Sequence, residues 1–183
     1  MITTIITDFD GTLVDTFGAN LRAYQSAFNS VGKELPADKY RQCFGLRFDA
    51  FMSHMGIFDE KEVHQIRETK AKCYPTYFDY LRPNKALIDL IDSFHRMGGK
   101  TAIASTARKE NLMNVVNFLK IAETFDNILA GIDVKKGKPS PEIYIKAMEA
   151  LNSSPSETLI FEDSEVGLEA AKASGAKYIK ITI

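Results

Sequence analysis

The strongest constraint on the fold is a change of pattern after Arg82-Pro83. From there, short apolar segments alternate with stretches whose apolar residues recur at helical spacing. Strands separated by helices in this way are typical of a parallel sheet that is covered on both faces, so the sequence predicts an α/β fold. We expect strands at 100–105, 126–129, 158–161 and 176–181, and helices at 84–97, 109–120, 141–151 and 165–173.

A first strand is expected from the apolar run Ile2 to Thr7. Right-handed crossovers between parallel strands place the carboxyl ends of the strands at one edge of the sheet. Asp8, Ser105 and Asp163 all come where an expected strand ends. A Rossmann-like sheet therefore gathers these polar residues at the edge where open α/β sheets bind their ligands.

Between the first strand and the alternating region lies a block with helical periodicity only. Leu21, Tyr24, Phe28 and Val31 follow three- and four-residue spacing, and Gly32 is expected to end this helix. Further helices fit 37–43, 48–55 and 61–80, the last one broken or kinked near Pro75. We therefore expect an α/β core domain of residues 1–14 and 82–183, and an inserted helical domain of residues 15–81 that contains no strand.

Composition argues against several classes of function. The 23 basic and 24 acidic residues give a formal charge of -1, which argues against a nucleic-acid-binding surface. No apolar run approaches the length of a membrane span, and the N-terminus lacks the basic region that begins a signal peptide. Cys43 and Cys73 are too few for a disulfide framework. We expect a cytoplasmic protein without a membrane or nucleic-acid partner, and a monomer as the default state.

The first strand is followed by Asp8-Phe9-Asp10-Gly11-Thr12. Asp8 and Asp10 are two residues apart, so on an extended chain they face the same side. Two carboxylates this close favour a hard dication such as Mg²⁺, and one can act as a nucleophile while the other carries a proton. Asp-Gly between β-formers is also a strong signal for a simple β-hairpin. The two interpretations are compatible, and this stretch alone does not decide whether the site is catalytic.

Three further polar sites follow strands or precede helices. Ser105-Thr106 is expected to open a helix whose free N–H groups could hold a phosphate, although a serine there is most often only a helix cap. Lys138 precedes a helix that starts at Pro141, in a loop where a lysine is ordinarily just solvated. Glu162-Asp163 lies between a strand and a helix, where acidic residues commonly compensate the helix dipole. Their convergence on one edge of the sheet favours a shared site.

In this order, the motifs resemble those of the haloacid dehalogenase superfamily, in the branch of β-phosphoglucomutase-like and phosphoglycolate-phosphatase-like members. Asp8-Phe9-Asp10-Gly11-Thr12-Leu13 corresponds to the first motif of that family, and Ser105 to the second. Lys138-Pro139 corresponds to the third motif and Glu162-Asp163 to the fourth. The helical block 15–81 lies where this branch inserts its cap domain, so the resemblance covers essentially the whole chain.

The resemblance implies a phosphatase that acts on a small phosphorylated metabolite, such as a sugar phosphate or a phosphoglycolate-like acid. Asp8 would attack phosphorus and form an aspartyl-phosphate, and Asp10 would serve first as general acid and then as general base. Mg²⁺ would be held by Asp8, the Asp10 backbone carbonyl and Asp163, with Glu162 in support. The phosphoryl oxygens would be bound by Ser105, Thr106 and Lys138.

Several alternatives stay open. Arg47 matches a cap loop that reaches the substrate in relatives, and Arg108 lies just past the expected phosphate-binding segment, but both are also compatible with ordinary exposed arginines. β-Phosphoglucomutases share all four motifs and carry a histidine where this chain has Asn20, a difference that favours hydrolysis over mutase activity. Dehalogenases lack the second carboxylate, which Asp10 supplies here. A non-catalytic phosphate-binding module, similar to a response-regulator receiver, is the remaining alternative.

Overall fold

A computed structural model describes residues 1–182. The chain divides into two compact units. One consists of Met1–Asp15 together with the chain from Arg82 onward, and it contains the main sheet. The other consists of Thr16–Leu81 and is helical. The helical unit is thus an insertion between the first strand and the rest of the sheet-containing unit.

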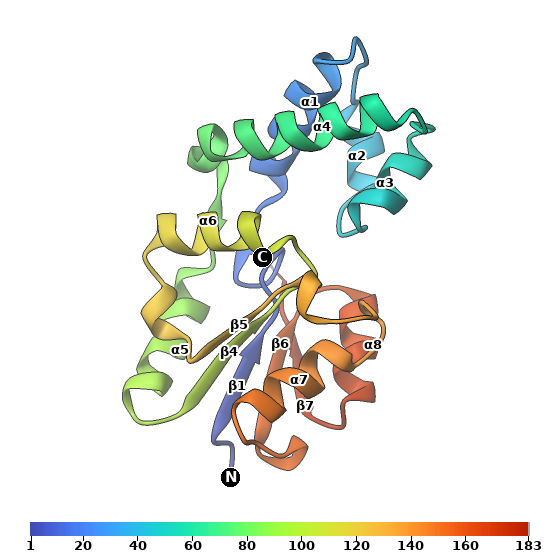
Figure 1. Cartoon of the computed structure of the whole chain (residues 1–183). Helices are drawn as coiled ribbons and strands as arrows, with labels where there is room; N and C mark the ends of the chain where they lie inside the picture. Colours follow the sequence, from blue (N-terminus) through green and yellow to red (C-terminus); the bar gives the residue numbers. More distant parts are fainter. Residues whose placement is uncertain (183) are drawn as a thin grey trace. The chain divides into compact units, whose positions relative to one another are not determined.

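The sheet has five strands, and each neighbouring pair is parallel. Strand β1 is central, because Ile6 pairs with Ala102 on one side and with Ile160 on the other. The expected α/β fold with a parallel, Rossmann-like sheet is therefore confirmed (Figure 1). In spatial order the strands are β5 (Asn127–Leu129), β4 (Lys100–Ala104), β1 (Thr4–Thr7), β6 (Thr158–Glu162) and β7 (Lys177–Lys180).

Helices cover both faces of this sheet, with α5 and α6 on one side and α7 and α8 on the other (Figure 1). The main core lies between the sheet and the second pair, where Ile6, Ile160 and Tyr144 are fully buried. No helix within residues 1–182 combines the length and apolarity that crossing a membrane requires. The helices are α5 (Lys85–Arg96), α6 (Lys109–Leu119), α7 (Glu142–Ala150) and α8 (Glu165–Ala173), and short 3-10 turns occur at η2 (Ala122–Thr124), η3 (Gly131–Asp133) and η4 (Pro155–Glu157).

The helical unit packs around a cluster of aromatic rings. The ring centroids of Tyr40 and Phe51 lie 5.5 Å apart, and those of Phe28 and Phe51 lie 5.8 Å apart. The break expected near Pro75 is confirmed: the α-helix ends at Cys73 and a 3-10 turn follows, since proline has no N–H to continue the helix. The elements are α1 (Phe17–Asn29), α2 (Ala37–Cys43), α3 (Phe48–His54), α4 (Glu60–Cys73) and η1 (Tyr74–Tyr80).

Two expectations for the segment after β1 need correction. Asp15 is part of a strand, because β2 (Val14–Asp15) pairs antiparallel with β3 (Arg82–Pro83). These two segments lead into and out of the helical unit, and their adjacency lets them share backbone hydrogen bonds. The β-hairpin alternative is also wrong, since β2 pairs with β3 and not with β1. Instead, a tight turn is closed by the Gly11 N–H, which donates to the Val14 carbonyl at 2.8 Å.

The buried core makes a direct prediction for stability. Ile160→Ala is expected to lower the free energy of unfolding by about 2–5 kcal/mol, because the truncation leaves a cavity at a fully buried position of β6. Urea denaturation followed by circular dichroism measures this loss. Ile132→Ala is the matched control, since Ile132 is 82% exposed, and its expected change is within about 0.5 kcal/mol. Equal losses in the two variants would contradict the assigned core.

Candidate active site

Strand ends supply the polar residues at the carboxyl edge of the sheet. Asp8 directly follows β1, and its backbone N–H donates to the Phe161 carbonyl of β6 at 2.9 Å. Ser105 follows β4, and Glu162 is the last residue of β6. The side chains of all three polar residues are buried. The hydrogen-bonded sheet itself therefore fixes their positions.

Lys138 joins two of these strand ends. Its Nζ atom lies 2.5 Å from Asp8 Oδ1 and 2.7 Å from Glu162 Oε2. The lysine side chain is only 6% exposed, so the alternative of a solvated loop lysine is wrong. An isolated buried charge is costly, which means that the lysine and the two carboxylates are stable only as a set.

Glu162 accepts hydrogen bonds on both carboxylate oxygens. Oε1 accepts from the backbone N–H of Asp163 and from the N–H and hydroxyl of Ser164, each at 3.0 Å. Oε2 accepts from Lys138 and, at 2.6 Å, from the hydroxyl of Tyr144 on α7. The sequence does not single out Tyr144, because an aromatic residue on the apolar face of a helix gives the same signal as any core residue. Glu162 thus connects β6, α7 and the turn before α8.

Asp163 is held by the turn that follows β1. The Thr12 hydroxyl donates to Asp163 Oδ1 at 2.6 Å. Gly11 has a φ of 96°, and a Cβ atom there would lie 2.4 Å from Asp163 Oδ2. Glycine is the residue that tolerates both this φ and this close approach. The structure thereby brings the first and fourth motifs together.

Asp10 and Ser105 form a second contact at the same edge. Ser105 Oγ donates to Asp10 Oδ2 at 3.3 Å and accepts from the Ala107 N–H at 3.1 Å. This local bond favours a turn over a helix, and α6 begins only at Lys109. The expectation that Ser105-Thr106 opens a helix is therefore wrong, and the half-buried Thr106 lies in a loop.

The helix after Lys138 also begins slightly later than expected. Pro141 is the N-cap residue and α7 starts at Glu142, whereas the sequence pattern predicts Pro141 at the first helical position. The Ser140 hydroxyl accepts from the Glu142 N–H at a long distance of 3.4 Å, so it is at most a weak cap. In contrast, Ser164 is a regular cap of α8 and accepts from the Gly167 N–H at 3.1 Å.

Burial and charge shift the proton affinities of the site. Burial raises the pKa of the Asp8 carboxyl well above its usual value, although the Lys138 charge opposes this shift. Burial also raises the pKa of Asp163. For Glu162, burial acts in the same direction, but the Lys138 charge and hydrogen bonds outweigh it and lower the pKa. Burial alone would lower the pKa of Lys138, whereas the charges of Asp8 and Glu162 raise it well above its usual value. Lys138 therefore stays protonated and Glu162 ionised at neutral pH.

A divalent metal ion fits this group of residues. One oxygen from each of Asp8, Glu162 and Asp163 lies within 4.8 Å of the other two. These donors are all carboxylate oxygens, the ligand type that Mg²⁺ prefers. A cation there would also stabilise the ionised forms of Asp8 and Asp163, which burial disfavours.

The hydrogen bonds and ion pairs described above do not involve the two arginines that the sequence singles out. Arg108 is exposed before α6, and its guanidinium lies 3.8 Å from the Glu110 carboxylate. Arg47 is exposed and immediately precedes α3 in the helical unit. A role for either residue in substrate binding stays a prediction.

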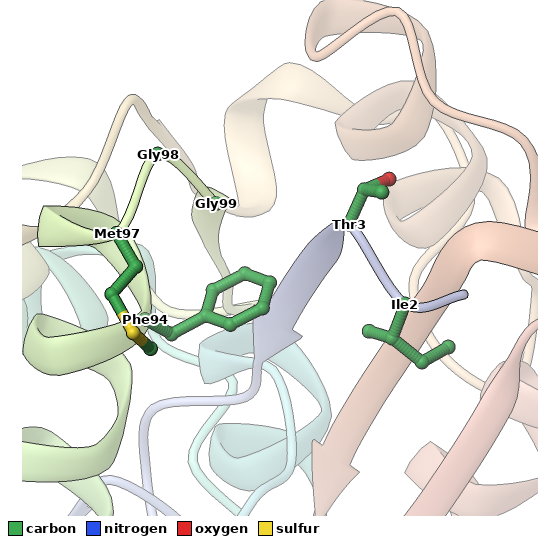
Figure 2. A pocket seen from close by; sticks show the side chains of 6 residues that line it. All are labelled: Ile2, Thr3, Phe94, Met97, Gly98 and Gly99. Carbon is green, nitrogen blue, oxygen red and sulfur yellow. The ribbon is translucent and has the colours of Figure 1, made fainter.

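A small pocket lies at the opposite end of β1. It has a volume of about 210 Å³ and contains no acid, base or thiol. Figure 2 shows the Phe94 ring projecting toward Thr3 across this space. Since it offers no catalytic group, the pocket does not compete with the carboxyl edge as an active site. Its lining residues are Ile2, Thr3, Phe94, Met97, Gly98 and Gly99.

Comparison with known proteins identifies the family. Residues 5–181 match the family model of haloacid dehalogenase-like hydrolases, and the chain belongs to this family. A relative from Thermotoga maritima, named a phosphorylated carbohydrates phosphatase, is 30% identical over an alignment that covers 96% of this chain and 82% of the relative. The family and this relative together make the chain a phosphatase-type hydrolase.

Solved structures agree with this assignment. CbbY from Rhodobacter sphaeroides in complex with phosphate is 29% identical, with a TM-score of 0.87 and coverage of 100% of this chain and 87% of that one. A mutant of the same protein has been solved in complex with xylulose-(1,5)bisphosphate. A β-phosphoglucomutase from Clostridium difficile, 23% identical with a TM-score of 0.82 and coverage of 100% and 86%, shows the shared fold alone.

The close approach of Gly11 to Asp163 makes the second prediction. Gly11→Ala is expected to lower the free energy of unfolding by about 2–4 kcal/mol, because the new Cβ strains the backbone and also collides with the Asp163 carboxylate. Gly98→Ala is the matched control: Gly98 has a φ of 88°, but a Cβ there meets nothing within 4 Å. Backbone strain alone should cost about 1 kcal/mol at the control position. Equal losses in denaturant titrations would contradict the tight packing of Asp163 on Gly11.

Proposed function

We propose that this protein is a Mg²⁺-dependent phosphatase that hydrolyses small phosphomonoesters such as sugar phosphates or phosphoglycolate-like acids. The observation that carries the proposal is the buried ammonium of Lys138 in contact with Asp8. An ammonium has three N–H groups, and those directed at Asp8 and Glu162 leave one for a phosphoryl oxygen. The relatives named as phosphatases support the same class of substrate.

In the proposed reaction, an Asp8 carboxylate oxygen attacks phosphorus. The bond from phosphorus to the ester oxygen breaks, the leaving oxygen takes a proton from Asp10, and an aspartyl-phosphate remains on Asp8. Asp10 then accepts a proton from a water molecule, which attacks the same phosphorus. Inorganic phosphate leaves and the Asp8 carboxylate is restored, so the two steps balance in atoms and charge. The contact between Ser105 and Asp10 holds the acid in place in the substrate-free protein, and the same hydroxyl would turn to a phosphoryl oxygen when the substrate binds.

Charge neutralisation should supply much of the rate, because phosphoryl transfer has a loose transition state with its charge on the peripheral oxygens. We assign this role to Lys138, the Ser105 hydroxyl and the backbone N–H of Thr106. When bound, Mg²⁺ would add Lewis-acid stabilisation of the phosphoryl oxygens. Asp8 and Asp163, together with the Asp10 backbone carbonyl, would hold the ion. Glu162 would support it, since its oxygens already accept several hydrogen bonds.

The helical unit Thr16–Leu81 is proposed to act as a cap that excludes water and selects the substrate. Arg47 on that unit and Arg108 after β4 are the candidate contacts for a second anionic group, which a guanidinium suits. The protein is proposed to work as a cytoplasmic monomer.

Mutase activity is the alternative function, because β-phosphoglucomutases share all four motifs. Asn20 lies on α1, and its side-chain amide donates to the Tyr74 hydroxyl at 3.5 Å. An amide cannot exchange a proton with a sugar hydroxyl, which favours hydrolysis. Incubation with β-glucose 1-phosphate and its bisphosphate activator separates the two activities. Glucose 6-phosphate formed without free phosphate would identify a mutase.

Phosphate release from a panel of metabolite phosphates with added Mg²⁺ tests the proposal. We expect hydrolysis with a preference for small phosphomonoesters, and a loss of turnover of at least about 10³-fold in Asp8→Asn, because the amide cannot form the covalent intermediate. EDTA is expected to abolish phosphate release, and excess Mg²⁺ to restore it.

Asp89→Asn provides the matched control for this screen, because Asp89 is an exposed carboxylate on α5. It should hydrolyse the same substrates at the wild-type rate. Activity that survives in Asp8→Asn, or that EDTA leaves intact, would contradict the mechanism. A protein that binds phosphate esters without turnover would point instead to the non-catalytic module.

A further inference from the structure

We infer that Tyr144 is a positioning residue, whose hydroxyl and ring hold Glu162 and Lys138 in the arrangement that directs the lysine at Asp8. The kinetic consequence of this inference rests on the proposed phosphatase function. Its structural consequence does not, because the contacts among Tyr144, Glu162 and Lys138 exist without a substrate.

Tyr144 contacts both charged partners from one buried position. Its hydroxyl donates to Glu162 Oε2 at 2.6 Å, and the same oxygen accepts from Lys138 at 2.7 Å. The Lys138 Nζ atom also lies 4.9 Å from the centre of the Tyr144 ring, a distance at which the ring face attracts a cation. Tyr144 is fully buried, so no water competes for these contacts from its side.

A purely structural role does not explain why this residue carries a hydroxyl. A phenylalanine would fill nearly the same volume in the core, without a polar group that must find a partner after burial. The hydroxyl of Tyr144 reaches the one Glu162 oxygen that also binds the lysine, whereas the backbone turn at Asp163 and Ser164 holds the other oxygen. The phenol therefore fixes the position of Oε2, the Glu162 oxygen that also binds Lys138.

Loss of the hydroxyl should loosen Lys138 relative to Asp8. A small displacement of a charge that neutralises the transition state lowers turnover more than it lowers the affinity for the ground-state substrate. In Tyr144→Phe we expect kcat to fall about tenfold while KM stays within about twofold. If Tyr144 acts through Glu162, the further loss on adding Tyr144→Phe to Glu162→Gln should be below about twofold, since residues of one network are not additive.

The kinetic test uses p-nitrophenyl phosphate with saturating Mg²⁺, and melting temperatures are recorded for each variant. Tyr178→Phe is the matched control, because Tyr178 is a 43% exposed phenol on β7 of the same unit, and it should keep the wild-type kcat. A wild-type kcat in Tyr144→Phe would overturn the inference. Full additivity with Glu162→Gln would do the same.

A second readout needs neither substrate nor metal. In the metal-free wild-type protein, the ammonium of Lys138 should give a persistent ¹H–¹⁵Nζ signal, assigned by its loss in Lys138→Arg. We expect this signal to shift and broaden in Tyr144→Phe and to stay unchanged in Tyr178→Phe. If it is unchanged in both variants, the inference is wrong whatever the kinetics show.

The two readouts also separate this inference from the proposed function. If no variant or wild-type protein releases phosphate but the ammonium signal responds to Tyr144→Phe, the proposed function fails and the positioning contact stands. If Tyr144→Phe does not fold, a measurement on the wild-type protein still tests the inference. A nuclear Overhauser contact between the Tyr144 ring protons and the Lys138 ammonium supports the inference, and its absence overturns it.

Discussion

One protonated lysine balances two buried carboxylates at the edge of this sheet, and the arrangement of the site follows from that pairing. Lys138 contacts Asp8 after β1 and Glu162 at the end of β6. Removing a charged group from water costs several kcal/mol, so neither carboxylate is stable there alone. The lysine comes from the loop before α7 and therefore ties that loop to two strands of the sheet. The ammonium that balances the two carboxylates is also the group suited to bind a phosphoryl oxygen.

The backbone around this set has to approach it unusually closely. A Cβ atom at Gly167 in the first turn of α8 would lie 2.0 Å from the Glu162 carboxyl group. Gly11 passes in the same way beside Asp163. Two glycines thus allow the turn after β1 and the start of α8 to pack directly on the acidic residues. This packing holds the carboxylates in place from several sides, and preorganisation of this kind is what electrostatic catalysis requires.

The sequence predicted the parallel sheet and the edge at which polar residues gather, because both follow from local periodicity and from the direction of parallel strands. It placed Asp8, Ser105 and Asp163 at that edge for the same reason, since each comes where an expected strand ends. Lys138 is different: it lies in a loop where a lysine is ordinarily solvated, and its role in binding phosphate came from the family resemblance. Its burial depends on contacts with residues that are distant in sequence, and the composition of the loop does not indicate such contacts.

The features that the sequence did not predict also depend on contacts between residues that are distant in sequence. Tyr144 was missed because its hydroxyl is paired across the fold, and a helical sequence pattern records only that the ring is apolar. The strand at Asp15 was missed because its partner, Arg82, lies far away in sequence.

The most direct test of the central claim is the free energy of unfolding of Lys138→Met in EDTA, where no divalent ion can replace the ammonium. The account predicts a loss of about 3–5 kcal/mol, because two buried carboxylates lose their counter-charge, and partial recovery when Glu162→Gln is added. Lys136→Met, at an exposed lysine of the same loop, should change stability by less than about 0.5 kcal/mol. A Lys138→Met protein as stable as the wild type would contradict the account.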